Sequence, residues 1–162
     1  MKGLVLDTSA LYYGKDLPAG YELAIPPGVV RELDKEGMGE RLQLLLATSV
    51  RVFHPSKRSI DRVRKEAEST GDIARLSDTD MEVLALALEL GYELVTDDYS
   101  IQNLARAIGV PCRGMEQKGI SKVVEWQARC TGCGKLLRID QKECDVCGHP
   151  SKTRRKRGSS ER

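Results

Sequence analysis

The sequence predicts an α/β fold: a parallel sheet flanked by helices, then a small cysteine-rich unit and a basic tail. Short apolar runs alternate with segments of helical periodicity up to about residue 115, which is the pattern of β-α-β units. Two cysteine pairs follow, and residues 151–162 contain no apolar side chain. We therefore expect an α/β domain over 1–115, a linker over 116–127, the cysteine unit over 128–150 and a disordered tail over 151–162.

The predicted strands are short and continuously apolar, as expected for strands buried on both faces of a sheet. The first covers 3–6 and is followed at once by Asp7. The other strands are expected over 22–25, 50–53, 94–96 and 110–112.

Helices are predicted between these strands. The clearest is 78–90, where Leu84, Ala87 and Leu88 recur at helical spacing. Further helices are expected from Thr8, around Val29 and Leu33, around Leu42 and Leu46, over 56–69 and over 100–107.

Composition excludes several classes of protein. The chain has 162 residues, of which 40% are hydrophobic, enough for a core. It contains no run near the roughly 18 apolar residues of a membrane span, and Asp7 comes too early for a signal peptide. We expect a cytoplasmic protein without a membrane partner, in which the five cysteines do not form a disulfide framework.

Charge is distributed unevenly along the chain. Residues 1–125 carry 16 basic and 20 acidic side chains, whereas residues 151–162 carry six basic side chains and one acidic one. An acidic body with a basic tail is a charge asymmetry that a function must explain.

Two C-x-x-C-G motifs predict a metal site. Cys130 and Cys133 form the first pair, and Cys144 and Cys147 the second. Each pair can direct two thiolates at one centre, so the two together make a four-cysteine site typical of one structural zinc ion. Iron would suit the same geometry, while disulfides or a redox motif fit a reducing compartment less well. His149 is interpreted as a bystander.

Four acidic residues stand where the α/β pattern would bring them together: Asp7, Glu32, Asp80 and Asp98. Asp7 and Asp98 follow strands, at the edge where parallel sheets bind ligands. Each acid taken alone could be a helix cap or a solvated side chain. Four acids facing one crevice would repel one another without a cation, and Mg²⁺ or Mn²⁺ prefers such oxygen ligands.

In order along the chain, the segments Val5–Ser9, Val29–Leu33, Leu76–Asp80 and Val95–Asp98 resemble the four acidic motifs of PIN-domain ribonucleases. The resemblance implies a PIN-like fold and assigns the catalytic acids to Asp7, Glu32, Asp80 and Asp98. It leaves auxiliary roles for neighbouring residues of the same motifs: Thr8, Ser9, Asp78, Thr96 and Asp97.

The order of PIN domain, zinc ribbon and basic tail resembles the archaeal Nin-one-binding protein family. That resemblance implies metal-dependent hydrolysis of single-stranded RNA with one or two Mg²⁺ or Mn²⁺ ions, in maturation of the 3′ end of small-subunit ribosomal RNA. The implied partners are this RNA, the pre-ribosomal particle and other assembly factors. Two alternatives stay open: a non-catalytic RNA-binding assembly factor, and a toxin-type PIN ribonuclease, whose chains usually end after the PIN domain.

An acidic pocket cannot attract RNA by itself, so the RNA-binding charge is expected on the ribbon and tail. The predicted RNA-binding residues are Lys135, Arg138, Lys142, Lys152, Arg154, Arg155, Lys156 and Arg157. The basic residues of the 56–69 helix are interpreted as a solvated face.

Overall fold

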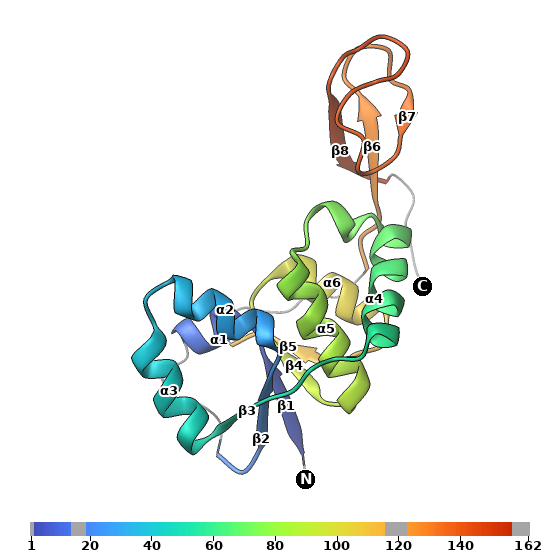
Figure 1. The fold of residues 1–162 in the computed structure, drawn as a ribbon. Coiled ribbons are helices and arrows are strands. Elements are labelled where there is room, and N and C mark those ends of the chain that lie inside the picture. Colours follow the sequence, from blue (N-terminus) through green and yellow to red (C-terminus); the bar gives the residue numbers. More distant parts are fainter. Residues whose placement is uncertain (1, 14–18, 116–122, 157–162) are drawn as a thin grey trace.

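A computed structural model describes residues 2–13, 19–115 and 123–156. It shows an α/β body and, at one end of it, a small β-ribbon (Figure 1). Within the described residues, no helix is both long and apolar enough to cross a membrane.

The body is built on a parallel sheet. Among the described residues this sheet has five strands in the order β3-β2-β1-β4-β5, and each neighbouring pair is parallel. The strand bounds are β1 Gly3–Leu6, β2 Glu22–Ile25, β3 Val50–Val52, β4 Glu93–Val95 and β5 Cys112–Arg113. The predicted fold class is confirmed, and the later strands shift by one or two residues.

Helices flank the sheet, and their ends follow local chemistry. Ser77 caps one helix in a reciprocal capping box with Asp80, and Gly71, with φ of 81°, ends another in the left-handed region. The helices are α1 Thr8–Tyr13, α2 Pro27–Lys35, α3 Gly39–Thr48, α4 Lys57–Thr70, α5 Asp78–Leu90 and α6 Tyr99–Ala107, with a 3-10 turn η1 over Asp72–Ala74.

The core lies between the sheet and these helices. Its largest fully buried side chains are mostly leucines and isoleucines, from β1, β2, α5 and α6 among other elements. Burial of the aliphatic side chains removes apolar area from water, which is the main stabilising contribution for such a body. Cys112 packs half-buried against this core.

The ribbon is a second, antiparallel sheet in the order β7-β6-β8. Its strands are β6 Trp126–Cys130, β7 Leu136–Leu137 and β8 Ser151–Arg155. The ribbon therefore begins at Trp126, inside the segment predicted as linker.

The prediction of a disordered tail is wrong for its first residues. Ser151–Arg155 forms β8 and pairs residue by residue with β6. A polar strand can form here because β6 offers an unpaired edge whose backbone groups need partners. Arg157 and the rest of the predicted tail lie outside the described residues.

Candidate active site and metal centre

Asp7 lies where β1 ends, at the carboxyl edge of the sheet. Ser9 Oγ donates to its carboxylate at 2.9 Å, and the Ala10 N–H donates to Oδ1 at 2.6 Å. The Thr96 hydroxyl, at the end of the neighbouring strand β4, donates to Oδ2. These donors hold a nearly buried carboxylate, 5% exposed, in one orientation.

Thr96 also positions the next acid. Its Oγ1 accepts the Asp98 N–H at 3.0 Å, and the Asp98 carboxylate caps α6 by accepting the N–H groups of Ser100 and Ile101 at 2.7 and 3.2 Å. One hydroxyl thus connects the backbone of one acid to the side chain of another, because β1 and β4 are adjacent.

The other two acids approach from helices. Glu32, on α2, accepts a hydrogen bond from the Thr8 hydroxyl. Asp80, on α5, accepts the Ser77 N–H at 2.7 Å within the capping box. The caps foreseen as the simpler interpretation are therefore present at Asp7, Asp80 and Asp98.

Electrostatic interactions connect the four acids in a chain, from Asp7 to Asp98, from Asp98 to Asp80 and from Asp80 to Glu32. Burial is the largest cause of a raised pKa at Asp7, and the negative charge of Asp98 raises this pKa further. Burial likewise raises the pKa of Asp80, with added contributions from Asp98 and Glu32. Carboxylates that repel one another in a partly dry crevice favour either a proton or a cation.

Two of the predicted auxiliary acids do not join this cluster. Asp97 accepts the Met115 N–H at 2.9 Å. Asp78 is 94% exposed and lies 3.7 Å from the Arg64 guanidinium. Thr8, Ser9 and Thr96 are the auxiliary residues that do touch the acids, through the hydrogen bonds described above.

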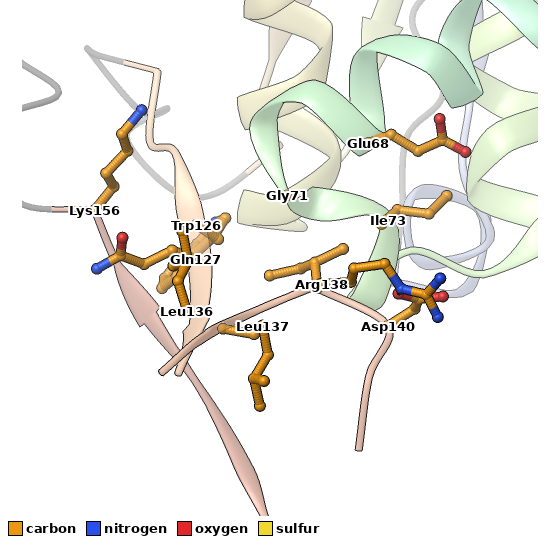
Figure 2. Close-up of a pocket in the computed structure, with 12 residues that line it drawn as sticks. Glu68, Gly71, Ile73, Trp126, Gln127, Leu136, Leu137, Arg138, Asp140 and Lys156 are labelled. Carbon is orange, nitrogen blue, oxygen red and sulfur yellow. The ribbon is translucent and has the colours of Figure 1, made fainter. Parts of the chain in front are cut away.

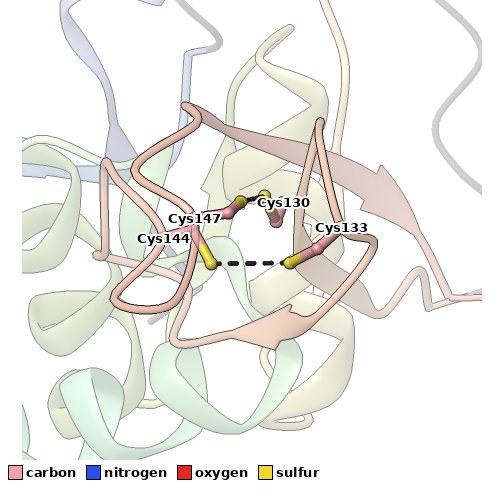
Figure 3. Close-up of side chains that lie close together, drawn as sticks. All are labelled: Cys130, Cys133, Cys144 and Cys147. Atoms are coloured by element: carbon pink, nitrogen blue, oxygen red, sulfur yellow. Dashed lines mark hydrogen bonds between the residues drawn. The ribbon is translucent and has the colours of Figure 1, made fainter.

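The four cysteines of the ribbon converge on one point (Figure 3). Their sulfurs all lie within 4.8 Å of one another, with Cys130 to Cys147 at 3.3 Å and Cys133 to Cys144 at 3.7 Å. A tetrahedral zinc with bonds of about 2.3 Å needs sulfurs about 3.8 Å apart. The Gly132 and Val146 amides donate to Cys130 and Cys144 at 3.3 and 3.4 Å, which favours thiolates.

His149 lies beside this site without joining the ligand group. Its Nδ1 is 3.2 Å from the Cys147 carbonyl. Within the described residues, the four cysteines are the only place where three or more His, Cys, Asp or Glu ligand atoms gather closely enough for one ion. No three of the four acids meet that condition.

The predicted RNA-binding residues occupy different surroundings. Lys135 pairs with Asp145 at 2.8 Å, Arg138 with Asp140 at 3.4 Å and Lys156 with Glu125 at 3.0 Å. Lys142 is exposed next to the ribbon's knuckles.

A basic face on the ribbon sheet emerges from strand register. Arg129 pairs with Lys152 and Gln127 with Arg154, so these side chains share one face. The three cations of this basic face, Arg129, Lys152 and Arg154, are exposed, whereas Arg155 alternates to the other face. The sequence interpretation missed Arg129, because the strand that would reveal its alternation was assigned to the linker and the cysteine unit.

A pocket of about 480 Å³ separates the ribbon from the α/β body (Figure 2). Trp126 and apolar residues of β7 line one side, and Gly71 and Ile73 line the other. Glu68, Arg138, Asp140 and Lys156 also line this pocket, so its polar residues carry both signs of charge.

Comparison with known proteins identifies the class. The profile of the PIN domain of ribonuclease matches residues 4–90. In fold, the chain is similar to one in the crystal structure of VapBC2 from Rickettsia felis, with TM-score 0.53, 18% identity and coverage of 69% of this chain and 98% of that chain.

Relatives in sequence cover nearly the whole chain. Endoribonuclease Nob1 of Pyrococcus abyssi is 41% identical over 152 residues, covering 92% of this chain and 91% of that protein. Ribonuclease VapC1 of Thermoplasma acidophilum is 38% identical over 148 residues, covering 91% and 76%. The chain belongs to the PIN-domain ribonucleases, in the family of the archaeal Nob1 endoribonucleases.

Proposed function

We propose that this protein is a metal-dependent endoribonuclease that hydrolyses single-stranded RNA and matures the 3′ end of small-subunit ribosomal RNA. The observation that carries the proposal is the cluster of Asp7, Glu32, Asp80 and Asp98, in which burial and mutual repulsion raise the pKa of two members. The family names of the relatives support the reaction and the substrate class.

The donor set fits a hard divalent cation. Carboxylate oxygens are the ligands that Mg²⁺ and Mn²⁺ prefer, and Mg²⁺ keeps several waters in its shell. Four carboxylates that do not gather closely enough to ligate one bare ion together suit one or two such hydrated ions. When bound, they lower the pKa of a water and stabilise the leaving oxygen of the phosphodiester.

The chain's own residues supply orientation. Thr96 and Ser9 fix both oxygens of Asp7, and Thr8 fixes one oxygen of Glu32. Because these carboxylates are held before RNA arrives, little reorganisation is needed during the reaction. Asp80 and Asp98 each commit a carboxylate oxygen to a helix cap, which keeps the side chains at the crevice.

The ribbon is proposed to hold one structural zinc through Cys130, Cys133, Cys144 and Cys147, with iron as the alternative ion. Its basic face is proposed to bind phosphate groups of the RNA, together with Lys135, Arg138 and Lys142. Pre-ribosomal particles and assembly factors are proposed as partners, and a cytoplasmic location stays a prediction.

The sequence leaves two alternative functions open, a non-catalytic assembly factor and a toxin-type ribonuclease. A non-catalytic assembly factor would use the acids as caps only. The toxin-type alternative rested on chains without a ribbon, yet the alignment to VapC1 covers 91% of this chain and so extends into the ribbon. The ribbon alone therefore does not separate the two kinds of ribonuclease.

The deciding variant is Asp7→Asn. Asn keeps the size and an oxygen that can accept the Ala10 N–H, so the cap is retained. We expect cleavage of RNA in Mn²⁺ to fall at least about a hundredfold, since a charged ligand for the cation is lost. Asp78→Asn, in an exposed position outside the cluster, is the matched control and should cleave normally.

The measurement pairs the cleavage rate in Mn²⁺ with the thermal midpoint in chelator. We expect the midpoint of Asp7→Asn to stay level or rise slightly, because one repelling charge is removed. Unchanged cleavage by Asp7→Asn would favour the non-catalytic assembly factor.

A further inference from the structure

The Asn103 side chain joins the α/β body to the segment that enters the ribbon. It is 3% exposed. Its amide nitrogen donates to the Val124 carbonyl at 2.8 Å, and its carbonyl accepts the Val124 N–H at 2.6 Å. The side-chain amide therefore pairs with both backbone groups of one residue, as a neighbouring strand would.

The same amide is fixed from behind. Its nitrogen also donates to Asp72 Oδ2 at 2.7 Å, and that oxygen accepts the Thr70 hydroxyl at 2.7 Å. Asp72 is fully buried. A charged acceptor inside the protein makes this a strong hydrogen bond, so the amide has one orientation.

Two further contacts dock the first ribbon residue beside this point. The Arg75 guanidinium carbon lies 3.4 Å from the centroid of the Trp126 ring. Gly71 approaches the Trp126 backbone so closely that a Cβ there would lie 2.6 Å from its carbonyl oxygen. Trp126 also lines the pocket between the ribbon and the α/β body, whereas Arg75 does not. The pocket therefore meets the indole away from the guanidinium.

Helix α6 connects this docking point to the acidic site. Gln102, the residue before Asn103, is also buried, and its amide donates to the Thr96 carbonyl at 2.8 Å. Consecutive helical side chains point about 100° apart. Helix α6 therefore holds the end of β4 at Thr96 through Gln102, and it holds the segment that enters the ribbon through Asn103.

We propose that Asn103 is a positioning residue that fixes the ribbon relative to the acidic site and thereby determines which phosphodiester of a ribbon-bound RNA is cleaved. The inference rests on the proposed function for its catalytic consequence. RNA held on the basic face reaches the acids at a fixed distance only while the Asn103 contact holds. An apolar residue would fill the same space but could not pair with the Val124 backbone.

The first test measures ribbon orientation and needs no RNA. Residual dipolar couplings are recorded on the full, zinc-loaded chain. For the wild type, one alignment tensor should fit both the body and the ribbon. For Asn103→Ala, the ribbon couplings should shrink while the body couplings stay. Equal couplings in wild type and variant would overturn the proposal.

Thr70→Val is the matched control. It removes a hydrogen bond of the same length from the same buried Asp72 carboxylate. Unlike Asn103, Thr70 has no hydrogen bond or ring contact with Val124 or Trp126. A purely structural role for the cluster would make the two variants alike. If Asn103→Ala fails to fold, Asn103→Leu replaces it, since leucine fills the same space but cannot pair with the Val124 backbone. Unchanged ribbon couplings in that variant would likewise overturn the proposal.

The second test maps cleavage positions on one RNA that spans a small-subunit 3′ end. We expect Asn103→Ala to cleave about 10- to 100-fold less at the wild-type position and to yield products at neighbouring positions, whereas Thr70→Val keeps the wild-type pattern. The wild-type pattern in Asn103→Ala would overturn the catalytic consequence. A wild type that cleaves nothing would instead reject the proposed function, and the couplings alone would then decide whether Asn103 fixes the ribbon.

Discussion

Asp72 shows how a single buried carboxylate affects stability. One of its oxygens, Oδ1, has no hydrogen-bond partner in the described part of the chain. Burial raises the pKa of Asp72, and the hydrogen bonds from Thr70, Asn103 and Trp126 together with the charge of Arg75 offset this only in part. The charged carboxylate is therefore disfavoured in the folded protein relative to the unfolded chain.

The sign of the pH dependence follows from this direction. A folded pKa above the unfolded value gives a stabilising contribution that is present below about pH 4 and is lost as the pH rises through the folded pKa. We expect Asp72→Asn to remove this dependence, so that the variant gains relative to the wild type as the pH rises. Thermal midpoints of both proteins from pH 4 to 8 measure it. A constant difference across that range would show that Asp72 titrates normally.

At the scale of an element, the cysteine knuckles should fold the ribbon only with metal. Its buried apolar cluster contains just Ala128, Cys130, Leu137 and Cys144, too few for a stable core, whereas a structural zinc contributes on the order of 10 kcal/mol. We expect Cys130→Ser to lose the metal and the ribbon's dispersed amide signals while the helical circular dichroism of the body stays. Metal analysis below about half an equivalent per chain in the wild type would contradict the site.

Strand β8 changes the expected effect of truncation. Removing residues 151–162 deletes the strand that pairs with β6 along its whole length and the Ser151 N–H bond to the Lys142 carbonyl at 2.7 Å. We expect this truncation to lose metal affinity, whereas removal of 157–162 keeps it. Zinc titration of both truncated proteins against the full chain measures the difference. Wild-type affinity after the longer truncation would show that β8 is dispensable for the metal site.

The sequence predicts the α/β body well because its strands are apolar and three of its described helices, α4, α5 and α6, carry side-chain caps. Glu22–Ile25 and Asp78–Leu90 form at the predicted bounds. The acids could be grouped because each follows a strand or lies in a helix whose place in the sheet order is predictable. β8 could not be predicted, since its side chains are polar and only pairing with β6 makes it a strand. Asn103 and Val124, 21 residues apart, meet without any periodic signal.

At the scale of the whole molecule, charge is expected to govern RNA affinity through the ribbon. Each phosphate contact on a single strand contributes about 0.7 to the log–log salt slope. Replacing Arg129, Lys152 and Arg154 with Gln should therefore reduce the slope by about 2. The control replaces Lys57, Arg58 and Arg62 of α4, which removes the same charge from the body. Affinity measured from 50 to 300 mM salt compares the two, and equal slopes would place the RNA elsewhere.

The pairing of β8 with β6 also determines the order in which the parts can mature during translation. The body is complete once Arg113 of β5 has left the ribosome, because all five strands of its sheet precede that point. The sheet of the ribbon is complete only after Arg155 has emerged, because its middle strand, β6, pairs with β8 along its whole length. Domains fold as units from the amino-terminal side during synthesis. A nascent chain thus presents folded acidic residues before it has a basic face, so under the proposed function it is expected to gain affinity for RNA only after the body has formed.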